Sequence, residues 1–178
     1  MLRLFVGIEF PPELKLHLSM LETVIPGARW VDPGNFHLTL RFIGEVDEGV
    51  AADIDEALVR LRARRFTLQL AGIGVFGGGK PRQLWVGVER HPELVALRDK
   101  IEKALIRIGL EPEQRKFAPH VTLARLREPV LDNLGEFLAA NAQFRAAPLP
   151  VEQFSLIASF PTKAGSIYED QADYPLSG

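Results

Sequence analysis

Residues 36–40 read Phe-His-Leu-Thr-Leu, and residues 119–123 repeat the pattern as Pro-His-Val-Thr-Leu. Both segments lie in short apolar runs that predict β-strands. Side chains of a strand alternate between its two faces, so each histidine shares a face with the threonine two residues later. The opposite face carries apolar residues that can join a core. Each segment therefore predicts one His-Thr pair on a strand that is anchored in a core.

The two histidines, His37 and His120, lie 83 residues apart, close to half of the 178-residue chain. This spacing predicts two similar lobes that each contribute one histidine to a shared site. We expect residues 1–178 to form a single bilobal domain, because no segment rich in proline, glycine or serine separates the halves.

The composition is that of an ordinary soluble globular protein, with 47% hydrophobic and 25% charged residues. No apolar run approaches the ~20 residues needed to span a bilayer, so no membrane association is expected. The first residues predict a strand and not a signal peptide, since Glu9 interrupts the apolar stretch. The chain contains no cysteine, which excludes disulfides, thiolate zinc sites and a cysteine nucleophile and fits a cytoplasmic location.

The formal net charge of −2 argues against a general polyanion-binding protein. If the protein handles nucleic acid, it is expected to bind an end or a few nucleotides in a local pocket. The protein is expected to be a monomer.

Periodicity predicts an α+β fold in which antiparallel sheets carry helices on their outer faces. Strands are expected over residues 2–9, 36–43, 66–70, 83–88, 119–126, 151–159 and 166–173, and helices over residues 12–24, 47–64, 92–108 and 131–140. The glycine-rich segment 72–82 is interpreted as a mobile hairpin loop beside the site. Its Lys80 and Arg82 are candidates to meet a phosphate group.

Two facing histidines can supply a base and an acid in one turnover, because imidazole titrates near pH 7. Threonine hydroxyls and an arginine would then hold the charge that builds on phosphoryl oxygens during attack on a phosphodiester. Arg41 follows His37 by four residues and is expected on the same strand face. Arg125 follows His120 by five residues, so it needs a bulge or the strand end to reach the site. Arg41 is therefore ranked above Arg125.

A zinc site is the main chemical alternative. Two histidines could bind zinc, but a catalytic zinc site usually has three protein ligands. Neither motif contains a carboxylate, so no metal is expected.

The two His-x-Thr-x segments resemble the signature of the two-histidine (2H) phosphoesterase superfamily. The chain is most similar to the bacterial and archaeal RNA 2′,3′-cyclic phosphodiesterases, the LigT-like family historically called 2′-5′ RNA ligases. The resemblance covers nearly the whole chain. It rests on residues 3–8, 36–45, 81–88, 117–125, 159–160 and 167–169.

The resemblance implies a bilobal fold with pseudo-twofold symmetry and a central cleft that holds both His-Thr pairs. It implies that the partners are RNA ends or short oligonucleotides with a 2′,3′-cyclic phosphate. The terminal cyclic phosphate would be opened to a 2′-phosphate, with reversible 2′-5′ ligation, and with no metal or nucleotide cofactor. By motif position, His37 would be the proton donor to the departing 3′ oxygen, and His120 would be the proton acceptor that activates water. Thr39 and Thr122 would bind the substrate phosphate.

The chain departs from the family pattern at one position. Many members place an arginine immediately before the proline of the second motif, whereas this chain has Ala118. Any phosphate contact by that arginine would then fall to Lys116 or Arg125.

Two functional alternatives stay open at this point. The same fold could act on another cyclic phosphate or serve as a nucleotide-binding module. An interaction protein with purely structural histidine strands is the second alternative, and it predicts that alanine at His37 and His120 alters stability without removing an activity.

Overall fold

The strands that carry the two His-Thr pairs belong to two different antiparallel sheets. A computed structural model describes residues 1–178, the whole chain. The first sheet has the strand order β10-β9-β1-β3. Its members are β1 (Leu2–Glu9), β3 (His37–Val46), β9 (Gln153–Thr162) and β10 (Gly165–Pro175).

The second sheet has the strand order β2-β7-β6-β5. Its members are β2 (Ala28–Trp30), β5 (Leu70–Phe76), β6 (Gln83–Val88) and β7 (His120–Leu126). A separate two-stranded pair joins β4 (Phe66–Leu68) to β8 (Leu149–Val151). The histidine strands β3 and β7 contact each other where the two sheets meet, so both His-Thr pairs lie at the junction of the lobes.

The chain crosses between the two sheets more than once. β2 lies between β1 and β3 in sequence but pairs with β7 of the second sheet. β9 and β10 come from the C-terminal end of the chain and complete the first sheet beside β1. Neither lobe is therefore a continuous half of the sequence.

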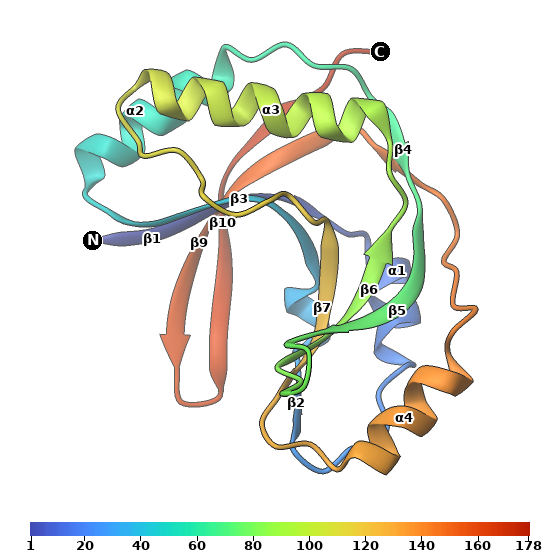
Figure 1. The fold of residues 1–178 in the computed structure, drawn as a ribbon. Coiled ribbons are helices and arrows are strands. Elements are labelled where there is room, and N and C mark those ends of the chain that lie inside the picture. The colour runs from blue at the N-terminus through green and yellow to red at the C-terminus, as the bar shows by residue number, and fades with distance from the viewer.

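Two pairs of helices cover the sheets from outside (Figure 1). The helices are α1 (Pro12–Ser19), α2 (Glu48–Val59), α3 (Pro92–Arg107) and α4 (Leu131–Ala140). In Figure 1, α2 and α3 run together along the first sheet, and α1 and α4 lie beside the second sheet. The Phe137 ring of α4 packs 5.7 Å from that of Trp30 in β2. No helix combines the length and apolar character that a membrane crossing requires.

The buried faces of the histidine strands match the alternation in the sequence. Leu38 and Val121 have no exposed surface, and Leu40 and Leu123 are at most 3% exposed. These residues join a continuous core that includes α2, α3 and the central strands β1 and β6. The predicted α+β architecture, with two antiparallel-sheet lobes and outer helices, is confirmed.

The bounds of several expected elements differ from the structure. The strand expected over residues 66–70 ends at Leu68, and the strand expected over residues 151–159 is divided into β8 and β9. α1 ends at Ser19, because the amides that follow bond three residues back and not four, Leu21 N to Leu18 O and Glu22 N to Ser19 O. α2 ends at Val59, because the chain then runs alongside the C-terminus, where Ser177 N donates to Ala63 O. Residues 72–76 belong to β5 and not to a loop, so the hairpin turn comprises only residues 77–82.

Candidate active site

Both histidine rings are held by the same main-chain contact. His37 Nδ1 donates to the Asn35 carbonyl and His120 Nδ1 donates to the Ala118 carbonyl, each at 2.7 Å. In each case the carbonyl belongs to the residue two positions earlier. With the proton on Nδ1, the neutral ring presents an unprotonated Nε2. His37 Nε2 accepts the Thr39 hydroxyl at 2.7 Å, so the histidine and threonine share a strand face as predicted.

Gln83 completes the second His-Thr pair. Its side-chain amide donates to the Thr122 hydroxyl and lies 3.5 Å from His120 Nε2. Gln83 is opposite Arg125 in the β6–β7 ladder, and both therefore lie on the His-Thr face. Sequence reasoning missed this residue, because a glutamine opening a strand carries no motif. The one available signal was its alternation with Trp85 along β6.

The two histidines have different aromatic neighbours. The His37 ring lies 4.7 Å from Phe5 and 5.1 Å from Tyr168, which also contact each other. The His120 ring meets Phe76 edge-on at 4.9 Å. In the registers of the two sheets, Phe5 occupies the position in the first sheet that the polar Gln83 occupies in the second sheet. The lobes are therefore similar in backbone and different in chemistry around the two imidazoles.

The aromatic surroundings of His37 change its protonation. The pKa of His37 is lowered to about 4, mainly by burial. The charges of His120 and Lys15 also lower this pKa, while the hydrogen bond to the Asn35 carbonyl raises it. The free protein therefore holds a neutral His37 at pH 7. The influence of His120 also shows that the two rings interact electrostatically across the lobe junction.

A β-bulge follows each His-Thr pair at the same position. The β1–β3 register steps from Gly7–Thr39 to Val6–Arg41 and passes over Leu40. The β6–β7 register steps from Trp85–Thr122 to Leu84–Ala124 and passes over Leu123. Because a bulge adds one residue to one strand, the side-chain alternation reverses beyond it.

Arg41 lies on the core side of β3 as a consequence, so its expected placement on the histidine face is wrong. Its guanidinium is 6% exposed and bonds to the Glu102 carboxylate of α3 at 3.0 Å. It also donates to the carbonyls of Phe42 and Glu111. These bonds occupy the guanidinium, so the structure gives no support to a phosphate contact by Arg41.

Arg125 reaches the histidine face through the equivalent bulge in β7. It is exposed and forms no ion pair. Its positive charge, like that of Arg3, acts on the Tyr168 hydroxyl, whose pKa burial raises above its usual value. The ranking of the two arginines is therefore reversed, and Arg125 is the better candidate for an anion contact.

The turn between β5 and β6 lies next to Arg125. The Leu126 amide donates to the Arg82 carbonyl at 2.8 Å and fixes the turn to β7. Lys80 and Arg82 are both exposed at this end of the site.

The residues around the histidines do not form a metal-ligand set. Three carboxylates, those of Glu9, Asp170 and Asp173, approach one another closely enough to share an ion. They are exposed and include neither histidine. His37 and His120 therefore lack the third ligand that a catalytic zinc usually takes.

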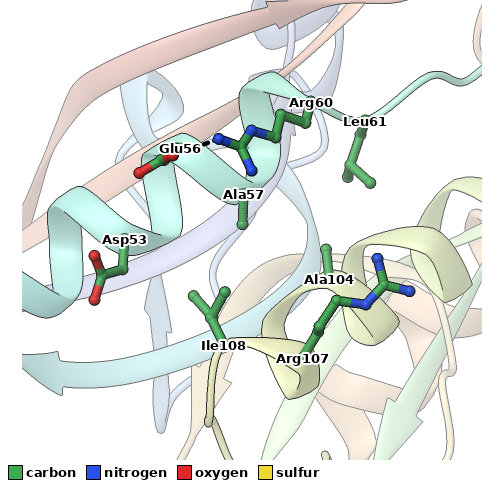
Figure 2. A pocket seen from close by; sticks show the side chains of 8 residues that line it. All are labelled: Asp53, Glu56, Ala57, Arg60, Leu61, Ala104, Arg107 and Ile108. Carbon is green, nitrogen blue, oxygen red and sulfur yellow. Dashed lines mark hydrogen bonds and ion pairs between the residues drawn. The ribbon is translucent and has the colours of Figure 1, made fainter.

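A surface groove lies away from the histidines. A groove of about 340 Å³ runs between α2 and α3, on the outer side of the first sheet (Figure 2). Its lining includes Asp53, the ion-paired Glu56 and Arg60, and Arg107. None of its lining residues belongs to the His-Thr face, so the groove is not part of this site.

Comparison with known proteins identifies the class that this fold and site define. The family model described as "LigT like Phosphoesterase" matches residues 8–85 and again residues 86–168. The chain belongs to this family. The two matches each contain one His-Thr pair and agree with the two-lobed structure.

Individual relatives match along nearly the full chain. An RNA 2′,3′-cyclic phosphodiesterase of Aeropyrum pernix is 40% identical over 87% of this chain and 89% of its own. A protein of the same name from Methanothermobacter thermautotrophicus is 31% identical over 98% of both chains. The Escherichia coli LigT crystal structure in the apo form superposes with a TM-score of 0.80 at 26% identity, covering 99% of this chain and 98% of that one.

Proposed function

We propose that this protein is an RNA 2′,3′-cyclic phosphodiesterase, which hydrolyses a terminal cyclic phosphate to a 2′-phosphomonoester. The observation that carries the proposal is the pair of similarly held histidines. Each has Nδ1 bonded to a main-chain carbonyl, so each neutral ring presents an unprotonated Nε2 on the His-Thr face. The relatives that carry this activity in their names support it. The E. coli LigT structures in complex with 3′-AMP and with phosphate support a nucleotide phosphate as the ligand.

The reaction follows from the two imidazoles. His120 Nε2 takes a proton from a water molecule while the water oxygen bonds to phosphorus. The bond from phosphorus to the 3′ oxygen breaks, and His37 gives its Nε2 proton to that oxygen. The phosphate remains on the 2′ oxygen. The two histidines exchange protons with solvent before the next turnover. The same steps with a 5′-hydroxyl group in place of water would give 2′-5′ ligation.

His37 must be protonated to act as the donor, although its pKa in the free protein is about 4. A bound phosphodiester brings a negative charge next to the ring, and an opposite charge favours the protonated form. Protonation at Nε2 also ends the bond from the Thr39 hydroxyl, because the nitrogen can no longer accept it. The hydroxyl is then free to donate to a phosphoryl oxygen.

In the second lobe, the Thr122 hydroxyl can donate to the phosphate without a change in the protonation of its histidine. The Gln83 amide donates to the Thr122 oxygen, so the Thr122 hydroxyl proton can point to the phosphate. Arg125 would add a charge-assisted contact from the strand end. We further propose that no metal takes part, and that the protein acts as a monomer in the cytoplasm.

The test uses a short RNA that ends in a 2′,3′-cyclic phosphate, with EDTA present. The wild type should release a 2′-phosphate end, and His37→Ala and His120→Ala should each lower kcat by about 10²–10⁴-fold. Both variants should remain folded by circular dichroism. Loss of the wild-type activity on chelation, with recovery on adding zinc, would rule out the metal-free mechanism.

A nucleotide-binding module is the second candidate, since E. coli LigT has also been crystallised with ATP and with NADP+. A folded wild type that is stabilised by mononucleotides and hydrolyses no cyclic phosphate would favour it. Turnover of the cyclic end by the wild type would exclude it as the sole function.

A further inference from the structure

Gln83 places both ends of its side-chain amide beside the second histidine. The amide nitrogen donates to the Thr122 hydroxyl and lies 3.5 Å from His120 Nε2. Because the His120 proton is on Nδ1, Nε2 is an acceptor, and the NH2 end of the amide suits it where the carbonyl end would not. The carbonyl oxygen, Oε1, accepts no hydrogen bond from the protein. It is not among the buried polar atoms that lack a partner, so it is open to solvent.

One water molecule can bridge Gln83 Oε1 and the base. The oxygen and nitrogen of a planar amide are about 2.3 Å apart, as their bond lengths require. Since the nitrogen is 3.5 Å from His120 Nε2, Oε1 lies within about 5.8 Å of Nε2. Two hydrogen bonds of about 2.9 Å to one water molecule span that distance. Such a water points one hydrogen at His120 and the other at Gln83.

The attacking water has two hydrogens, and the base takes only one of them. A bond from the second hydrogen to a fixed acceptor holds the water in one orientation, with an oxygen lone pair free to face phosphorus. Orientation of this kind removes part of the entropic barrier to attack. A glutamine has the same task in GTPases, where it orients the water that attacks the γ-phosphate.

The first lobe offers no such acceptor. Phe5 takes the place of Gln83 there, and its ring packs 4.7 Å from that of His37. In the proposed reaction, His37 protonates the leaving 3′ oxygen, which needs no acceptor. The polar residue therefore lies on the side of the nucleophile, and the apolar residue lies on the side of the leaving group.

We propose that Gln83 orients the attacking water through Oε1 and thereby favours hydrolysis over attack by an alcohol. A methanol molecule, or the 5′-hydroxyl group of a second RNA, has a single hydroxyl hydrogen, which goes to His120. Neither has a second hydrogen to donate to Oε1. The inference rests on the proposed function, because it takes His120 as the base that activates the nucleophile.

The experiment makes methanol compete with water for the same substrate. A short RNA that ends in a 2′,3′-cyclic phosphate reacts in dilute methanol, and the 2′-phosphate and its methyl ester are quantified. In methanolysis the methanol oxygen bonds to phosphorus and His120 takes its proton, while the bond to the 3′ oxygen breaks and His37 protonates that oxygen. Both products come from one bound substrate, so their ratio does not depend on KM or on the amount of folded enzyme.

Gln83→Leu should lower the ratio of hydrolysis to methanolysis about tenfold, which corresponds to ~1.4 kcal/mol. Gln83→Glu keeps an acceptor oxygen at this position and should retain most of the wild-type ratio. The total turnover of Gln83→Glu should still fall, because a carboxylate cannot donate to the Thr122 oxygen. This difference between the two variants separates the acceptor oxygen from the rest of the side chain.

Gln69→Leu is the matched control. Gln69 is also half-buried and lies immediately before β5, but its amide donates to the main-chain carbonyls of Leu70 and Ala146. The substitution should lower stability and leave the product ratio equal to that of wild type.

The outcomes separate this proposal from the proposed function. If wild type forms both products and Gln83→Leu gives the same ratio, Gln83 does not orient the water and the proposed function stands. A ratio that falls equally in Gln83→Leu and Gln83→Glu would also contradict the role of Oε1. If wild type forms no methyl ester, its formation by Gln83→Leu supports the proposal and its absence contradicts it. If folded wild type opens the cyclic phosphate with neither nucleophile, the proposed function fails first.

Discussion

At the scale of single residues, the two histidines differ although their motifs match. In each ring the Nδ1–H group donates to a main-chain carbonyl. The neighbours differ, because Phe5 and Tyr168 pack against His37, whereas the side-chain amide of Gln83 lies beside His120. An aromatic enclosure desolvates a charged ring, and a polar neighbour does not. The neighbours of the two histidines can therefore decide which ring acts as the proton donor and which acts as the proton acceptor.

Tyr168→Ala should raise the pKa of His37. The Tyr168 ring lies 5.1 Å from His37, and burial is the largest cause of the lowered pKa of about 4. Removing the ring admits water, which favours the imidazolium, so the pKa should move upward toward 6.5. The acidic limb of the pH profile of kcat/KM, which reports the free enzyme, should move in the same direction.

NMR titration of the His37 ring measures this pKa directly. Tyr168→Phe is the control, because it keeps the ring and should leave the His37 pKa low. A His37 pKa that is the same in Tyr168→Ala and wild type would contradict the burial argument.

Arg41→Leu should destabilise the protein without removing a substrate contact. Arg41 is 6% exposed and paired with Glu102, so the substitution leaves a buried carboxylate that retains Arg98 alone. The expected loss is about 3 kcal/mol of unfolding free energy, the lower end for breaking a buried pair. Urea denaturation measures it, and the double variant Arg41→Leu, Glu102→Leu should recover part of the loss.

Arg125→Gln should affect substrate binding and not stability, because the bulge in β7 places Arg125 on the exposed histidine face. It should leave the unfolding free energy within about 0.5 kcal/mol of wild type, as for an exposed residue, and should raise KM. If Arg41→Leu were as stable as wild type and had a raised KM, the result would indicate that Arg41 contacts the substrate.

At the scale of elements, the sequence predicts the strands and their faces up to the bulges. The alternation in residues 36–40 and 119–123 placed both His-Thr pairs correctly. The extra residue at Leu40 and Leu123 then reversed the faces, and this put Arg41 in the core and Arg125 on the surface. A bulge depends on the partner strand, so one strand's sequence does not reveal it.

Short or distant pairings were also invisible in the sequence. β2 has only three residues and pairs with β7, almost a hundred positions later. The glycines of residues 72–76 predict a loop, whereas these residues belong to β5. Gly74 is a strand residue whose missing side chain leaves room for the Trp85 indole, so glycine here reflects packing and not a turn.

Gly74→Ala should disturb the packing of the second lobe on its His-Thr face. A Cβ atom on Gly74 would lie 2.2 Å from Trp85 Cζ2, and the Trp85 ring packs at 5.1 Å on Phe76, which contacts His120. The indole must move, so we expect a loss of about 1–3 kcal/mol in stability and a lower kcat. Tryptophan fluorescence and urea denaturation check the first effect, and turnover checks the second.

Gly79→Ala is the matched control. A Cβ atom at Gly79 meets no atom within 4 Å, and the residue lies in the β5–β6 turn. Its stability and turnover should equal those of wild type. Equal behaviour of the two glycine variants would show that the Trp85 position does not matter.

At the scale of the whole molecule, the crossing of the chain between sheets joins the two lobes. β2 belongs to the second sheet, although β1 and β3, which flank it in the sequence, belong to the first. β9 and β10, from the C-terminal end of the chain, also belong to the first sheet. The chain segments that form one sheet are therefore directly connected to segments of the other, so unfolding of one sheet should destabilise the other. This arrangement supports the prediction of a single domain over residues 1–178 and leads to a test of it.

The two sheets should unfold in one cooperative step. Val6 in β1 and Val86 in β6 are fully buried on the central strands of different sheets. Their amides should exchange hydrogen only through global unfolding, with the same free energy, in the range of about 5–15 kcal/mol for a single domain. Urea denaturation followed by circular dichroism should return that value. If Val86 exchanged through an opening several kcal/mol lower than that of Val6, the second lobe would unfold on its own, and the chain would comprise two domains that share only the catalytic junction.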